Sequence, residues 1–168
     1  MEPIEPVVPH FQEELEELKA RLLVMGGEVE EQVRSAGVAL LKRDHDLCQK
    51  VVTGDGSINR LHVEIDKRCF RLLALHQPMA TDLRVIVSAV KINSDLERIG
   101  DFAVNVAEAA LGYLAHPSVK PLIDIPRMDE LAQGMLRDSL DAYIKHCLLY
   151  TSDAADDTPC VDLGGRRI

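Results

Sequence analysis

The chain has 168 residues, a formal net charge of −9 and a hydrophobic content of 46%. This length corresponds to one domain or slightly more, with enough apolar residues to build a core. Aromatic residues make up only 4% and tryptophan is absent, and a chain dominated by leucine, valine and alanine favours helix packing over a β-sandwich. An acidic chain without a basic cluster is unsuited to nucleic acid or an anionic membrane surface as its primary partner. We therefore expect an all-α protein that binds no nucleic acid.

The sequence also indicates where the protein works. No stretch approaches the roughly 20 apolar residues that cross a bilayer, and the first residues lack the basic-then-apolar order of a signal peptide. We therefore expect a cytoplasmic protein that does not insert into the membrane. The four cysteines form no C-x-x-C pair and lack zinc-ligand spacing, so we expect reduced thiols and no disulfides.

The N-terminal part predicts a short extended segment followed by a long helix. Prolines at the third, sixth and ninth positions favour an extended conformation over residues 1–10. Apolar residues then recur at steps of three and four over residues 11–40, with Gln32 as the one polar interruption, which is typical of a bundle helix. The phase continues across Gly26-Gly27, so we expect a bend or a close helix contact there rather than a helix end.

A second helix is expected from about Asp46 to His76. The segment Thr53-Gly54-Asp55-Gly56 looks locally like a turn, but the three-four rhythm runs straight through its glycines, which favours one continuous helix. Gln77-Pro78-Met79-Ala80 then makes a tight connection to a third helix over Thr81 to Leu114. The second and third helices are therefore predicted to be antiparallel neighbours.

The third helix carries two contrasting faces. Its predicted core stripe consists of Val85, Ala89, Ile92, Leu96, Ile99, Ala103 and Val106. The opposite face includes an oxygen-rich stretch without lysine, made of Asn93, Ser94, Glu97, Asp101, Asn105 and Glu108. Like charges four apart on a helix repel by roughly 0.2–0.5 kcal/mol, so Glu97 and Asp101 need water or a cation nearby. Their oxygens suit a hard metal ion, and a solvated outer face is the alternative.

A second pair of potential ligands lies across the predicted hairpin. Counted outward from Pro78, His62 lies about as far back along the second helix as Glu97 lies forward along the third. Asp66 is one turn from His62 on the same face, so His62, Asp66, Glu97 and Asp101 are the predicted metal ligands. The alternative for His62 is a partly exposed helix histidine.

The C-terminal part changes character. After Leu114 a proline-punctuated connector leads to a fourth helix that begins near Arg127. The helical rhythm stops after His146, and residues 147–168 resemble the conceptual translation of a transposon-type sequencing adapter. We therefore exclude residues 147–168 from the fold and expect the natural protein to continue differently. A genuine disordered tail is the alternative.

Several of these segments resemble the first half of a PhoU-type phosphate-uptake regulator. The resemblance covers about residues 11–146. Its most specific parts are the turn Gln77-Pro followed by Thr81-Asp-Leu-Arg, and the run Leu96-Glu-Arg-Ile-Gly-Asp101; Met25-Gly-Gly-Glu-Val-Glu and Ile65-Asp66 add to it. It implies an antiparallel three-helix bundle over residues 11–116. Residues 117–146 are then the connector and first helix of a second, truncated bundle.

The same resemblance implies a regulatory adaptor. Such a protein links a phosphate ABC transporter, through its ATPase subunit, to a membrane sensor kinase, and represses the phosphate-starvation response; a homodimer is implied as well. Metal ions, often iron, are implied at Glu97, Asp101 and Asp66, whereas His62 departs from the acidic residue usual at its position. No enzyme is expected, because the chain has no phosphate-loop motif, no nucleophile constellation and no Glu-x-x-His pair. A metal-binding or purely structural bundle without a signalling role is the alternative.

Overall fold

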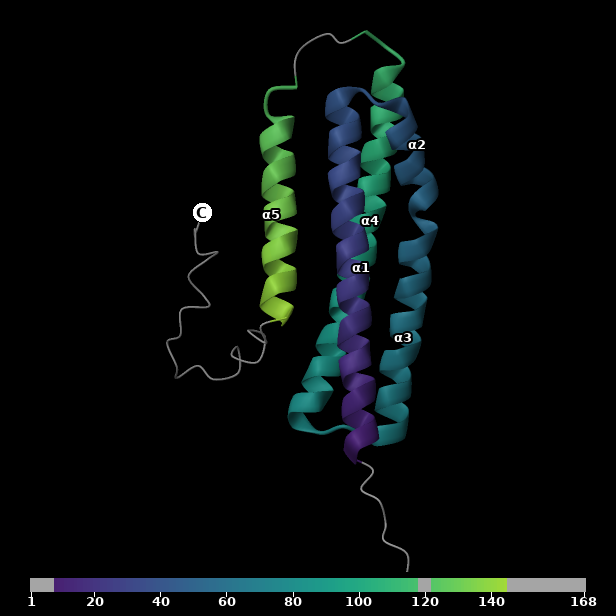
Figure 1. The fold of residues 1–168 in the computed structure, drawn as a ribbon, viewed down its shortest axis with the longest axis vertical. Helices are drawn as coiled ribbons and strands as arrows, with labels where there is room; N and C mark the ends of the chain where they lie inside the picture. The colour runs from purple at the N-terminus through teal and green to yellow at the C-terminus, as the bar shows by residue number, and fades with distance from the viewer. Residues whose placement is uncertain (1–7, 118–121, 145–168) are drawn as a thin grey trace, which may run out of the picture.

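The computed structural model describes residues 8–117 and 122–144, and within these ranges the regular structure is entirely helical. The helices are α1 (Val8–Lys42), α2 (His45–Gly54), α3 (Gly56–His76), α4 (Ala80–Leu114) and α5 (Ile125–Ile144). They lie side by side in one elongated bundle (Figure 1). The predicted all-α class is confirmed, and none of the helices in the described ranges has the length and apolar character needed to cross a membrane.

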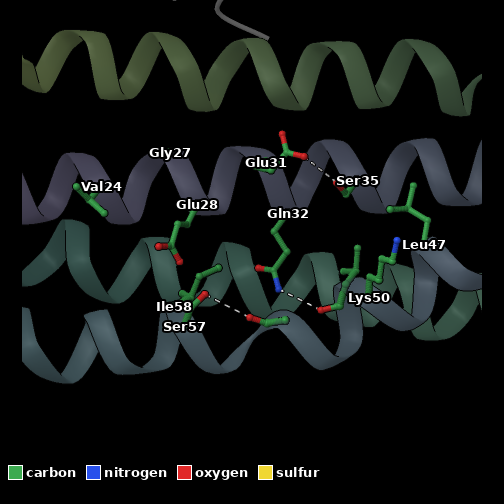
Figure 2. A pocket seen from close by; sticks show the side chains of 12 residues that line it. Val24, Gly27, Glu28, Glu31, Gln32, Ser35, Leu47, Lys50, Ser57 and Ile58 are labelled. Atoms are coloured by element: carbon green, nitrogen blue, oxygen red, sulfur yellow. Dashed lines mark hydrogen bonds between the residues drawn. The ribbon is translucent and has the colours of Figure 1, made fainter.

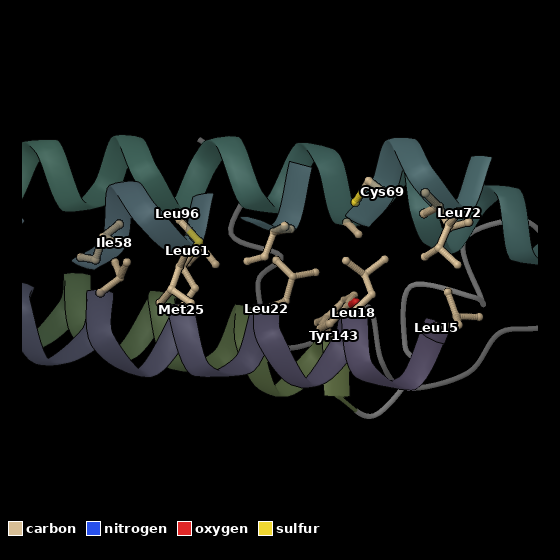
Figure 3. Close-up of a cluster of buried hydrophobic side chains, with 14 of the residues drawn as sticks. Leu15, Leu18, Leu22, Met25, Ile58, Leu61, Cys69, Leu72, Leu96 and Tyr143 are labelled. Atoms are coloured by element: carbon tan, nitrogen blue, oxygen red, sulfur yellow. The ribbon is translucent and has the colours of Figure 1, made fainter. Parts of the chain in front are cut away.

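Helix α1 is central, because it packs against each of the other four helices. The buried residues of α1 follow the three-four rhythm seen in the sequence, and they meet side chains from α3, α4 and α5 in one apolar cluster (Figure 3). Burying one such side chain completely contributes about 1.5–3 kcal/mol, so this cluster is the main source of stability. Its members include Leu15, Leu18, Leu22 and Met25 from α1, Leu61 and Leu72 from α3, Leu96 from α4 and Tyr143 from α5.

The two neighbouring glycines of α1 have different surroundings. Helix α1 runs through both without interruption, as the phase predicted. A Cβ atom added at Gly26 would lie 2.7 Å from Leu140 Cδ2, whereas one added at Gly27 would meet nothing within 4 Å. Gly26 therefore permits the close approach of α5, which the sequence predicted as one of two possibilities for this pair.

The start of α1 and the second predicted helix differ from expectation. Residues 8–10, predicted to be extended, are helical, since proline is tolerated in the first turn; residues 1–7 lie outside the described part. The helix predicted over Asp46 to His76 is interrupted at Asp55, because glycines on both sides of Asp55 each weaken a helix by roughly 0.5–1 kcal/mol. Asp55 nevertheless keeps helical angles, φ −59° and ψ −25°, so the apolar phase passes from α2 into α3.

The α3–α4 hairpin is antiparallel, as predicted (Figure 1), but the buried stripe of α4 is rotated from the predicted one. Asn93 and Gly100 are buried, whereas Val106 is 40% exposed. Ile92 and Ile99 are only partly buried, because they lie on the flank of α4 beside α5. Helix α5 packs against α1 and leaves a groove of about 540 Å³ along this flank.

The remaining predictions concern the cysteines and the chain end. Cys48 and Cys69 are buried free thiols, in agreement with the expected reduced state. Cys147 and Cys160 lie outside the described residues, as does the whole adapter-like segment 147–168. The division into a first bundle and the beginning of a second one stays a prediction.

Candidate functional site on the hairpin of α3 and α4

Helix α3 presents the first half of the predicted site. His62 and Asp66 lie one turn apart, and both are partly exposed. His62 Nε2 is 3.8 Å from Asp66 Oδ2, while His62 Nδ1 is buried without a hydrogen-bond partner. The predicted proximity of these two side chains is therefore present in the structure.

Asn93 joins this pair to α4. Its Nδ2 group donates hydrogen bonds to the backbone oxygen of His62 and to Asp66 Oδ1, each at 3.0 Å. Asn93 is fully buried, and its own Oδ1 has no partner. The sequence placed Asn93 on the polar outer face, but in the structure it lies between the two helices and fixes their register.

The acidic pair of α4 lies further along the hairpin. Glu97 is partly buried and Asp101 is exposed. Arg98, the nearest basic residue in the sequence, pairs instead with Asp95, with 3.4 Å between Nη1 and Oδ1. The two carboxylates on α4 therefore receive no neutralising charge from Arg98.

Cys69 lies in α3 three residues after Asp66 and is fully buried. Burial, and to a lesser extent the negative charge of Asp66, raise the pKa of the Cys69 thiol to about 11. The thiol is therefore protonated at neutral pH, unlike the thiolates that bind metals or act as nucleophiles. Cys69 belongs to the core and adds no ligand to the site.

The donor set suits a hard metal ion in type but not in arrangement. Carboxylate, amide and imidazole groups are all present. Within residues 8–117 and 122–144, however, no three histidine, cysteine, aspartate or glutamate side chains come together as a metal site would require. His62 with Asp66 and Glu97 with Asp101 remain two separate pairs, so the residues as arranged do not fit a closed metal centre.

Sequence reasoning missed Asn93 as a linking residue. The available signal was its spacing, since Asn93 continues the series Ile86, Ala89, Leu96 and Gly100 at steps of three and four. We assigned Asn93 to the polar face because asparagine is polar, although its spacing matched the buried series.

The fold and this hairpin define the class of protein: an all-α bundle in which Asn93 links two antiparallel helices that carry polar pairs. A family model described as the PhoU domain matches residues 22–110. The chain belongs to the PhoU family.

Individual relatives support this assignment. The chain is 40% identical over 149 residues to a phosphate-specific transport system accessory protein PhoU homolog of Aquifex aeolicus, which covers 89% of this chain and 67% of the relative. It is similar to the crystal structure of PhoU from Pseudomonas aeruginosa, with a TM-score of 0.78, 40% identity and coverage of 80% and 65% of the two chains. For the phosphate transport system regulatory protein PhoU from Streptococcus pneumoniae the TM-score is 0.74, the identity 34% and the coverage 81% and 64%.

These comparisons bear on two predictions. The chain spans about two thirds of the length of these relatives. Their names are those of accessory or regulatory proteins rather than enzymes, in agreement with the expectation of a non-enzymatic protein. The predicted PhoU resemblance is confirmed.

Proposed function

We propose that this protein is a cytoplasmic adaptor that represses the phosphate-starvation response when phosphate is plentiful. It does so by linking the ATPase subunit of a phosphate ABC transporter to a membrane sensor kinase. The observation that carries this proposal is the match to accessory and regulatory proteins of phosphate transport, in sequence and in fold together. The acidic net charge of −9 supports partners with basic docking surfaces, whose association weakens as salt rises.

A segment exchange tests the regulatory role. Residues 11–144 replace the matching segment of Pseudomonas aeruginosa PhoU in a strain that lacks its own copy and carries a phosphate-starvation reporter. We expect the chimera to lower the reporter in high phosphate, as the unmodified host protein does in parallel. A chimera that is folded by circular dichroism and present at normal level, yet leaves the reporter high, would refute the proposal.

A second test concerns the partners and the assembly state. The tagged chimera is expected to retain the transporter ATPase subunit and the sensor kinase in a pull-down, with less retained at high salt. Light scattering after size exclusion is expected to give the mass of a homodimer. Salt-insensitive retention would contradict the basic docking surface, and a monomer mass would contradict the dimer.

The alternative is a metal-binding or structural module without a signalling role. What favours it is the 3.8 Å approach of His62 to Asp66 and, apart from that pair, the spacing of Glu97 and Asp101 one turn apart on α4. The double substitution Glu97→Ala and Asp101→Ala separates the candidates when iron and other metals are measured together with the reporter. Loss of bound metal with intact repression indicates a metal-binding module, and no change in either indicates a solvated face.

A further inference from the structure

A second site lies on the other side of the bundle. A groove of about 640 Å³ runs between α1 and the junction of α2 with α3 (Figure 2). Its walls are largely apolar and include Val24, Leu47, Val51 and Ile58. The volume falls in the roughly 300–1,000 Å³ range of small-ligand sites. None of the four predicted metal ligands lines this groove.

Two oxygen atoms of α1 in this groove have no hydrogen-bond donor. They are Glu28 Oε2 and Gln32 Oε1. Gln32 is only 8% exposed, and its Nε2 makes one long hydrogen bond of 3.5 Å to the backbone oxygen of Val51. Figure 2 shows both side chains extending from α1 toward the α2–α3 segment. Buried polar atoms are normally paired, so two neighbouring acceptors without donors require an explanation.

The spacing places these acceptors together. Glu28 and Gln32 are four residues apart on α1 and therefore share one face of the helix. Gln32 Oε1 lies next to α4, 3.2 Å from where a Cβ atom of Gly100 would stand, so this acceptor is at the inner wall of the groove. These two acceptors suit a ligand that donates at least two hydrogen bonds.

Two carboxylates and one ammonium group line the groove. Glu31 also lines it, but its carboxylate already pairs with Arg34, with 2.9 Å between Oε2 and Nε. Lys50 lies toward the other end of the groove, beside Leu47 in Figure 2. Glu28, whose Oε2 has no hydrogen-bond donor, is therefore the carboxylate in the groove that a bound cation would balance.

We propose that this groove binds a guanidinium group from an arginine side chain of a partner protein. Guanidinium is planar, always charged, and carries five donors and no acceptor. One such group can donate to Glu28 and Gln32 at once, while its methylene stem packs against the apolar walls. This assignment rests on the two acceptors and the apolar walls, and it does not depend on the role in phosphate uptake.

A substitution at Gly27, which lines the groove, can block ligand binding. Gly27 lines the groove and has open space where a side chain would be, whereas the adjacent Gly26 contacts α5. Gly27→Leu therefore places a bulky group in the mouth without entering the core. Leucine also favours a helix more than glycine does, so the variant keeps its fold.

The test is an NMR titration of the full chain. The probe is N-acetyl-L-arginine methylamide, and its neutral isostere N-acetyl-L-citrulline methylamide is the control ligand. The side-chain amide signals of Gln32, assigned by their loss in Gln32→Met, are expected to shift saturably with the arginine probe. We expect citrulline to bind about tenfold more weakly, and Glu28→Gln to weaken the arginine probe by about tenfold.

Matched variants make the result decisive. Glu13→Gln alters an exposed carboxylate of the same helix outside the groove and must leave binding unchanged, whereas Gly27→Leu must abolish it. An immobile Gln32 signal, equal binding of both probes, or full binding by Gly27→Leu overturns the proposal. Free L-arginine binding more tightly than the capped probe would overturn the assignment to a partner protein.

Discussion

Replacing Asn93 tests how α3 and α4 are held together. Asn93→Ala removes the hydrogen bonds to the His62 backbone oxygen and to the Asp66 carboxylate. A neutral hydrogen bond contributes about 1 kcal/mol and one to a charged group about 1.5–3 kcal/mol, while removing the unpaired Oδ1 of Asn93 returns about 1 kcal/mol or more. We therefore expect a net loss of about 2 kcal/mol in the free energy of unfolding.

The assay is urea unfolding followed by circular dichroism for Asn93→Ala, Asp66→Ala and the double variant. Because the two residues share a hydrogen bond, their effects should be non-additive by about 1 kcal/mol. Asn105→Ala, which alters an exposed asparagine of the same helix, is the control and should change stability by less than about 0.5 kcal/mol. Additive effects, or an Asn93→Ala variant no weaker than the control, would refute this reasoning.

Three further predictions address stability elsewhere. Gly27→Ala should raise stability by about 0.5–1 kcal/mol, and Gly26→Ala should gain less because its Cβ meets Leu140 at 2.7 Å; equal melting temperatures would contradict that contact. Burial raises the pKa of Cys69 from 9.0 to about 11, so the unfolded chain loses this proton first and stability should fall between these pH values. Unfolding titrations should show a shallower alkaline slope for Cys69→Ala than for the parent. Asp44→Ala removes the side chain that caps α2 by a 3.0 Å hydrogen bond and should cost about 1 kcal/mol, with faster amide exchange in α2; unchanged exchange would contradict the cap.

The helices follow from the sequence where apolar periodicity decides them. The rhythm of α1 and the antiparallel pairing of α3 with α4 were predicted because each depends on local spacing and a short connection. The break at Asp55 was not, because Asp55 stays helical and the phase continues across it. The spacing of apolar residues predicts which face of a helix is buried, but it does not predict a local loss of backbone hydrogen bonds.

The site was harder to predict, because it depends on where polar groups meet. Pairing of His62 with Asp66 follows from spacing within one helix. Burial of Asn93 does not, since it depends on the hydrogen bonds that a facing helix offers. Gln32 was recognised as the polar interruption of α1, but the groove beside it exists only once α2 and α3 have been placed.

The shortness of the connection between α3 and α4 has a consequence for the order of folding. Only Gln77, Pro78 and Met79 separate these helices in the sequence. In contrast, all of α2 and α3 lies between α1 and α4 in the sequence. A short loop costs less entropy to close, and local contacts form sooner than distant ones. The hairpin is therefore expected to nucleate folding and α1 to dock last. Asn93→Ala should then slow refolding, whereas Leu18→Ala in α1 should mainly accelerate unfolding.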